Sequence, residues 1–416
     1  MSTLVTWVAR LLLPGFGLTA LATPGCSSAT DEETAASDAT ELSSATDATP
    51  SDPRATAATK ALFASLADYG AGGARKKILF GQQEADVANT SHYGTTPLRS
   101  DVEQLTGRMP ALVSYELSSI YMGSTTMFDP EAFRRGAPAL RELIRDKHAK
   151  GIRVALVWHM RCPKAYPGDS DRYAPSSCPA DYTMEELLET TQHGARGRHF
   201  DEWRAILDEL AELLWSLKDD AGQLIPVQVR PFHELTGDWF WWGRSNYPAV
   251  YQKVWREMVS YLRDRRGLHN VLWVFCPDKP TDRWQLESGG DFEKYFPGDA
   301  FVDVVGFDRY DDDSGSFARG YEDDLAKVGS FARVHHKLAA VTEIGRDMKR
   351  LGTRPGSKWF TQSMLAPLTR GEGREFSYVA LWRNAPWEKY MPEPGDGDIA
   401  ADFKAMTTRG VALAGD

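Results

Sequence analysis

The chain has 416 residues, a formal net charge of −10, and 11% aromatic residues that include 13 tryptophans. An acidic balance argues against nucleic acid as a partner, because phosphate backbones bind to basic faces. The length suits two or three average domains, or one α/β barrel of roughly 250 residues or more, so length alone leaves the fold open.

The first 26 residues have the layout of an export signal. Arg10 precedes an apolar run, and small residues lie before Cys26. The run is too short for a stable membrane span, so we expect a signal peptide over residues 1–26. Thr23-Pro24-Gly25-Cys26 also resembles a bacterial lipobox, in which the cysteine carries a lipid. Simple secretion and a lipid anchor at Cys26 on the outside of a bacterial cell are both open.

Residues 27–57 consist mainly of Ser, Thr, Ala, Asp and Pro. Such a segment buries too little apolar surface to offset the entropy lost on ordering, so we expect a disordered linker. A single folded domain is expected over residues 58–416.

Short apolar runs alternate with longer amphipathic segments in this domain. The expected strands are 77–82, 110–116, 153–159, 225–234, 271–277, 302–309, 337–343 and 376–383. The expected helices are 131–150, 199–219, 246–265, 316–335 and 356–368, with weaker candidates after the first and fifth strands. Eight nearly continuous apolar strands with helical crossovers predict a (β/α)8 barrel, and a doubly wound open sheet is the alternative.

Three cysteines follow Cys26. Cys162 and Cys178 flank a polar stretch that contains proline, a pattern that favours a disulfide in an oxidising compartment. Cys276 directly follows an apolar run and is expected to be a buried free thiol. The sequence has no Cys/His spacing typical of zinc, and we predict no metal.

Polar and aromatic residues recur where the expected strands end. They are Gln82-Gln83-Glu84, Glu116, Trp158-His159, His233-Glu234, Asp278, Asp308-Arg309-Tyr310, Glu343 and Trp382-Arg383-Asn384. The C-terminal ends of barrel strands meet at one face, where active sites gather. The recurrence therefore predicts one cleft.

Residues 230–243, at the end of the fourth expected strand, interleave charged residues with aromatics. A hydrophobic core does not favour this mixture, because an unpaired buried charge is costly. A sugar-binding cleft favours this mixture, because aromatic faces stack on pyranose rings. The same aromatics raise the pKa of a carboxylic acid that protonates a glycosidic oxygen. We expect Trp239 in the cleft and at least one of the next three aromatics behind it.

Two glutamates are candidates for the chemistry. Glu234 ends the fourth expected strand and Glu343 the seventh, and these strands face each other across a barrel mouth. Carboxyl groups about 5–5.5 Å apart would form a retaining pair, with one acid and one nucleophile. The alternative is that each is a structural ion-pair partner, but two on opposed strands beside aromatics favour catalysis.

Five further residues are candidate ligands of substrate or of these carboxylates. His233 is expected to orient the site and His159 to bind a sugar hydroxyl. Tyr310 can hydrogen-bond a nucleophilic carboxylate and keep it ionised. Trp382 is expected to be a sugar platform, and Arg383 either binds a sugar hydroxyl or forms a surface ion pair.

These motifs resemble glycoside hydrolase family 26, which β-mannanases dominate, over about residues 76–403. The matching segments are 79–83, 158–159, 230–234, 239–243, 273–278, 295–310, 342–345 and Trp382. The resemblance implies a retaining (β/α)8 enzyme in which Glu234 is the general acid/base and Glu343 the nucleophile. The residues that it implies at the cleavage subsite are His159, His233, Trp239, Tyr310 and Trp382. Arg383 is similar to an arginine that holds the non-reducing side of the chain in some members.

The function that the resemblance implies is an endo-acting β-1,4-mannanase. The expected partner is a β-mannan polysaccharide or oligosaccharide, and the expected protein is a monomer without a cofactor. The same mechanism on mixed-linkage β-glucan or β-1,3-xylan is one alternative. A non-catalytic glycan-binding barrel is the other. Many members have a histidine where this chain has Gln82-Gln83-Glu84, which weakens the prediction of the substrate.

Overall fold

The computed structural model describes residues 48–416 except 71, 95, 118–129, 161, 163–172, 244–246 and 282–291. The expected signal peptide, Cys26 and most of the expected linker lie outside the described residues. Within them, no helix is both long enough and apolar enough to cross a membrane.

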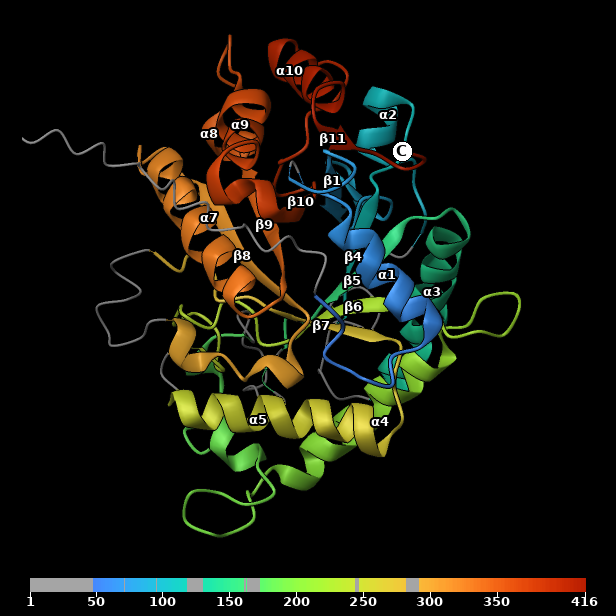
Figure 1. The fold of residues 1–416 in the computed structure, drawn as a ribbon, viewed down its shortest axis with the longest axis vertical. Coiled ribbons are helices and arrows are strands. Elements are labelled where there is room, and N and C mark those ends of the chain that lie inside the picture. The colour runs from blue at the N-terminus through green and yellow to red at the C-terminus, as the bar shows by residue number, and fades with distance from the viewer. Residues whose placement is uncertain are drawn as a thin grey trace, which may run out of the picture. The chain divides into compact units, whose positions relative to one another are not determined.

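Parallel strands form a closed barrel, with helices outside them (Figure 1). The strands are β1 (Ile78–Gln83), β4 (Leu112–Glu116), β5 (Arg153–Val157), β6 (Val227–Arg230), β7 (Val271–Phe275), β8 (Val304–Asp311), β9 (Leu338–Arg346) and β10 (Phe376–Leu381). Each pairs with the next, and β10 closes the ring by pairing with β1, where Leu79 lies opposite Tyr378. The (β/α)8 prediction is confirmed, and the open sheet is excluded.

Amphipathic helices connect the strands, as expected. They are α3 (Pro130–Ala149), α4 (Phe200–Ser216), α5 (Pro248–Ser260), α7 (Phe317–Val334) and the pair formed by the wide turn η7 (Trp359–Leu365) and α9 (Ala366–Leu368). Short helices α2 (Asp101–Thr106) and α8 (Met348–Leu351) follow β1 and β9. In α4, the buried residues Trp203, Leu207, Leu210 and Leu214 recur at helical spacing and face the core.

Helix α1 (Ala57–Ala67) closes the N-terminal end of the barrel and was not expected from the sequence. Its residues Leu62, Phe63 and Leu66 share one buried cluster with inward residues near the strand starts, such as Leu79 and Leu272. Since this end is filled with apolar side chains, the barrel interior is closed here.

The folded domain begins earlier than residue 58. The backbone N–H of Ser51 donates to Oδ1 of Asp303 at 2.6 Å, and Asp52 Oδ2 lies 2.7 Å from Nδ1 of His269. Thr56 caps α1 by accepting a hydrogen bond from the N–H of Thr59. The composition of residues 27–57 predicted disorder up to the end of this segment, because composition cannot show that its polar residues meet buried polar partners.

Two elements at the C-terminus were also not expected. Helix α10 (Asp398–Thr407) packs Phe403 against Phe80 of β1, with ring centroids 5.3 Å apart. The two-residue strand β11 (Val411–Ala412) pairs with Ile78 and Leu79. A strand this short carries no periodicity that a sequence could reveal.

The predicted states of the three cysteines agree with the structure. A disulfide joins Cys162 to Cys178 after β5. Cys276 is a buried free thiol. The disulfide therefore ties together a long insertion on the side of the barrel where the strands end.

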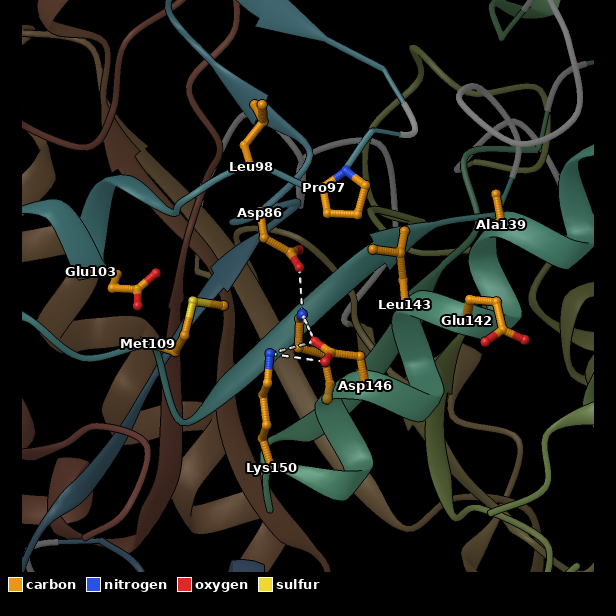
Figure 2. Close-up of a pocket in the computed structure, with 11 residues that line it drawn as sticks. Asp86, Pro97, Leu98, Glu103, Met109, Ala139, Glu142, Leu143, Asp146 and Lys150 are labelled. Atoms are coloured by element: carbon orange, nitrogen blue, oxygen red, sulfur yellow. Dashed lines mark hydrogen bonds and ion pairs between the residues drawn. The ribbon is translucent and has the colours of Figure 1, made fainter. Parts of the chain in front are cut away.

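A pocket of about 620 Å³ lies on the flank of the barrel, between α2, α3 and the loop after β1 (Figure 2). Beside it, Nζ of the buried Lys147 lies 2.5 Å from both Asp86 Oδ2 and Asp146 Oδ2. Tyr115 of β4 donates to the other oxygen of Asp86 at 2.9 Å. This ion-pair cluster attaches the loop after β1 to α3 and to β4, outside the predicted cleft.

Candidate active site

Glu343 faces the barrel interior because of an irregularity in strand pairing. Phe307 of β8 lies opposite Val341 of β9, but the next residue, Asp308, lies opposite Glu343 rather than Thr342. In a regular strand, Thr342 and Glu343 would point to opposite faces. The extra residue lets both side chains reach the interior: Thr342 Oγ1 donates to Asp308 at 2.6 Å, and Glu343 bonds Arg230.

Glu234 lies beyond its strand, not within it as the sequence predicts. Strand β6 ends at Arg230, and Phe232 and Glu234 have φ values of 48° and 52°. Positive φ is unfavourable for residues with a side chain and cannot continue a strand. The surrounding structure holds this loop, since the N–H of Glu234 donates to the carbonyl of Cys276 at 2.9 Å, and the Tyr251 hydroxyl donates to that of Phe232 at 3.0 Å.

The predicted glutamates meet across the cleft. One carboxylate oxygen each of Glu234, Asp308 and Glu343 lies within 4.8 Å of the others. Glu343 is 3% exposed, and Glu234 is partly exposed. The sequence prediction that these two carboxyls approach each other agrees with this distance.

Glu343 is held by two donors. Arg230 Nη2 donates to its Oε1, and the Tyr310 hydroxyl donates to its Oε2 at 2.6 Å. Burial and the neighbouring Glu343 raise the pKa of Tyr310 well above its usual range, so this phenol remains a donor. Both contacts fix the orientation of the Glu343 carboxyl group toward the cleft.

Arg230 also binds Asp308, with Nη1 2.6 Å from Oδ2. Burial raises the pKa of Asp308 to about 6, although the Arg230 charge opposes the rise. Neither residue had a predicted role. The signal that could have identified them is their position at the ends of β6 and of the β8 run, beside predicted site residues.

Glu234 is in the opposite electrostatic environment. Burial raises its pKa well above the usual range, and the charges of Asp278, Asp308 and Glu343 raise it further. Trp239 Nε1 donates to Glu234 Oε2 at 2.6 Å and partly opposes this rise. The site thus has one carboxyl group whose raised pKa favours the protonated form, as an acid requires, and a second carboxyl group held by a guanidinium and a phenol.

The aromatic residues after Glu234 divide into two groups, as expected. Trp239 is half-buried beside the carboxyl group. Behind it, Trp242 is fully buried and stacks on Phe240 with ring centroids 4.5 Å apart. Trp241 donates from Nε1 to the carbonyl of Met160 at 2.8 Å and so fixes the start of the disulfide-bonded insertion.

The model of glycosyl hydrolase family 26 matches residues 51–349. This chain belongs to glycosyl hydrolase family 26. It is 31% identical to a mannan endo-1,4-β-mannosidase of Bifidobacterium adolescentis over 86% of this chain and 34% of that protein. It is 27% identical to a mannan endo-1,4-β-mannosidase of Caldalkalibacillus mannanilyticus over 68% of this chain and 50% of that protein. The chain therefore spans between a third and a half of the length of these curated relatives.

A solved structure of a family 26 β-mannanase from Bacteroides ovatus is similar to this family 26 chain. It has 30% sequence identity and a TM-score of 0.70, and the match covers 87% of this chain and 96% of that one. A modular endo-β-1,4-mannanase from Cellulomonas fimi has 29% identity and a TM-score of 0.73, with 88% and 78% covered.

Two histidines of this family 26 site form a chain with a buried carboxylate. His159 Nδ1 bonds Glu116 Oε2, and its backbone N–H donates to Glu116 Oε1 at 3.0 Å. His159 Nε2 lies 3.1 Å from Nε2 of His233. Burial, and then His159 and Arg230, lower the pKa of His233 well below its usual range, so His233 is neutral. Glu116 had no predicted role, because its partner lies 43 residues away in sequence.

The two predicted residues after β10 lie together in this family 26 barrel. The Arg383 guanidinium carbon is 4.4 Å from the centroid of the Trp382 ring. Arg383 Nε lies 3.1 Å from Glu388 and 3.4 Å from Glu84, whose pKa burial raises to about 7. The ion pairs of Arg383 are therefore largely buried rather than superficial, and its side chain is 15% exposed.

Within the described part of this family 26 chain, two groups have the spacing of metal ligands. They are His159, His233 and Glu343, and Glu234, Asp308 and Glu343. Both groups include Glu343, whose oxygens already accept from Arg230 and Tyr310. A cation would have to compete with these donors, and the absence of a metal remains a prediction.

Proposed function

We propose that this chain is a retaining endo-β-1,4-mannanase that hydrolyses mannan-type polysaccharides. The observation that carries the proposal is the pair Glu234 and Glu343, with carboxylate oxygens within 4.8 Å and opposite electrostatic environments. Retaining glycosidases have carboxyl groups about 5–5.5 Å apart, whereas inverting ones need about 6.5–9.5 Å to admit a water. The short separation supports the retaining mechanism.

In the first step, Glu343 attacks the anomeric carbon of the sugar. A bond forms from its carboxylate oxygen to this carbon as the glycosidic C–O bond breaks, and Glu234 gives its proton to the leaving oxygen. Trp239 holds Oε2 of Glu234, so the proton is best placed on Oε1. Arg230 and Tyr310 orient Glu343 for this attack.

In the second step, the glycosyl-enzyme ester is hydrolysed. Glu234, now a carboxylate, takes a proton from water as the water oxygen attacks the anomeric carbon. The ester bond breaks, Glu343 leaves as a carboxylate, and Glu234 is protonated again. Two displacements at one carbon retain its configuration, and the cycle needs no cofactor.

The neighbouring side chains supply sugar contacts in this proposal. Trp382 is the sugar platform, and His159, 19% exposed at its side chain, binds a hydroxyl. His233 positions His159 through the contact between their Nε2 atoms. Arg383 contacts the non-reducing side of the chain while Glu84 and Glu388 hold it.

The proposal that mannan is the substrate is based on the names of relatives. Those from Bifidobacterium adolescentis and Cellulomonas fimi are described as acting on β-1,4-mannan. The test is to incubate the purified protein with linear β-1,4-mannan, galactomannan, lichenan and β-1,3-xylan, and to resolve the products by length. A ladder of manno-oligosaccharides from the mannans alone supports the proposal, and mannobiose as the sole early product contradicts endo action. Cleavage of lichenan or xylan alone contradicts the proposal that mannan is the substrate. Inactivity on all four polysaccharides contradicts the proposal that the protein is an enzyme.

We also propose that the protein is exported, either secreted or lipid-anchored through Cys26, and acts as a monomer. The basic and apolar N-terminal residues and the disulfide between Cys162 and Cys178 support export. Cell fractionation of the wild type and a Cys26→Ala variant separates the two routes. Release of the variant from the membrane fraction indicates an anchor, and light scattering gives the oligomeric state.

A further inference from the structure

The Tyr93 ring lies next to Arg383, and the Trp387 ring contacts Tyr93. Tyr93 belongs to the hairpin of β2 (Ala88–Asn89) and β3 (His92–Tyr93), and Trp387 to the loop after β10. Their ring centroids are 5.1 Å apart, with the ring planes at 67°. Trp387 is 55% exposed, the most exposed tryptophan among the described residues.

These rings continue the site without a break. The Arg383 guanidinium carbon lies 4.4 Å from the Trp382 ring centroid and 5.2 Å from that of Tyr93. The Trp382 ring is in turn 6.4 Å from that of Tyr310, which binds Glu343. Each group thus contacts the next, from Tyr310 beside the nucleophile through Trp382, Arg383 and Tyr93 to Trp387.

The loop that carries Trp387 is held firmly at its base. Asn384 is buried; its side chain donates to Asp101 at 2.7 Å and accepts from the N–H groups of Tyr390 and Met391 at 2.8 Å. Ala385 and Glu388 exchange two backbone hydrogen bonds, which places Trp387 in the tight turn between them. This support presents an indole to solvent on a defined backbone.

The hairpin that carries Tyr93 is attached to the same loop. Thr90 Oγ1 donates to Glu393 Oε1 at 2.6 Å. The Tyr93 hydroxyl lies 3.5 Å from Glu84, which pairs with Arg383. Both rings are therefore positioned by the groups that position Arg383.

An exposed indole held in this way is suited to stacking on the flat apolar face of a sugar. Trp215, the other exposed tryptophan in the described part of the chain, differs because its Nε1 donates to the carbonyl of Arg266 at 2.9 Å. It therefore contributes to packing between α4 and the turn after α5. We propose that Trp387, supported by Tyr93, forms an additional binding subsite for a sugar unit of the β-glycan chain, beyond the unit at Arg383. The inference rests on the proposed function. It adds that the enzyme should prefer oligosaccharides long enough to reach Trp387.

The experiment compares wild type, Trp387→Ala and the control Trp215→Ala on manno-oligosaccharides of increasing length. We expect Trp387→Ala to lower kcat/KM for long oligosaccharides by roughly three- to tenfold, the range for a lost aromatic contact. The shortest oligosaccharide that is cleaved does not reach the subsite, so its kcat/KM should not change. Trp387→Tyr should restore most of the lost activity, and Trp215→Ala should behave as wild type on all lengths.

An equal loss at every length, or no loss at any length, would overturn the inference, and a melting curve for each variant shows whether an equal loss comes from misfolding. Failure of the proposed substrate gives a different result. If wild type cleaves another β-glycan, the same length series on that glycan still tests Trp387. If wild type cleaves nothing, calorimetric binding of the same oligosaccharides replaces kcat/KM, and only a length-dependent loss of affinity in Trp387→Ala supports the subsite.

Discussion

Tyr310 donates a 2.6 Å hydrogen bond to Oε2 of Glu343 from the neighbouring strand. A hydrogen bond to a charged group contributes about 1.5–3 kcal/mol. We expect Tyr310→Phe to lower kcat by roughly ten- to a hundredfold while KM changes little, because the contact serves the reacting carboxylate. Steady-state kinetics on a soluble manno-oligosaccharide measures both constants. A rise in KM with unchanged kcat would instead mean that Tyr310 binds substrate.

Glu234→Ala should separate the two chemical steps. With an aryl glycoside, whose leaving group needs no proton, the glycosyl-enzyme should still form but water should attack it slowly. Added azide needs no general base and should restore turnover, giving a glycosyl azide with the configuration of the substrate. Glu343→Ala is the matched control. With this variant, added azide should not give a glycosyl azide with the configuration of the substrate. A product of inverted configuration from Glu234→Ala would contradict the assigned roles.

The pH profile should depend on Asp278. A carboxyl group with a raised pKa is protonated below that pKa and loses its proton above it, so Glu234 sets the alkaline limb of kcat/KM. The negative charge of Asp278 helps to raise this pKa. Asp278→Asn should therefore move the alkaline limb to lower pH. Asp238→Asn, the control, removes a nearby exposed carboxylate and should leave the alkaline limb in place. If the limb also stays in place in Asp278→Asn, the charge of Asp278 does not raise the pKa of Glu234.

Lys147 should be important for stability and not for chemistry. It is buried between Asp86 and Asp146, and removing one partner of a buried ion pair costs about 3–5 kcal/mol. We expect Lys147→Ala to lower the free energy of unfolding by about this amount in denaturant titrations. The exposed Lys150 also pairs with Asp146, at 2.8 Å, and Lys150→Ala should cost less than about 1 kcal/mol. Equal losses of unfolding free energy in the two variants would show that the burial of Lys147 does not make its ion pairs more important for stability than that of Lys150.

Much of the barrel could be predicted because its strands are nearly continuous apolar runs. The same runs place Glu343, Tyr310 and Trp382 where strands end, and the structure brings these side chains together. The backbone of Glu234 could not be predicted, since its positive φ is imposed by Cys276 and Tyr251 from other elements. Composition also does not reveal which polar residues belong to the folded domain. Ser51, for example, lies in a segment whose composition predicted disorder.

The partners of the glutamates were harder to foresee. Arg230 pairs with Asp308 and Glu343 only because β8 and β9 shift register by one residue, and no local pattern in the sequence records that shift. Glu116 and His159 likewise meet through the pairing of β4 with β5. Single residues at strand ends are visible in a sequence, whereas the pairs that they form depend on contacts between distant segments.

The N-terminal attachment of the domain lies at the end of the barrel opposite to the cleft. Ser51 and Asp52 bond to Asp303 and His269, which lie just before the first residues of β8 and β7. The chain therefore enters at the end of the barrel that α1 closes, and the glutamates lie at the other end. A segment that joins the domain at Ser51 therefore joins it on the side opposite to the glutamates, so the point of attachment leaves the mouth of the cleft uncovered.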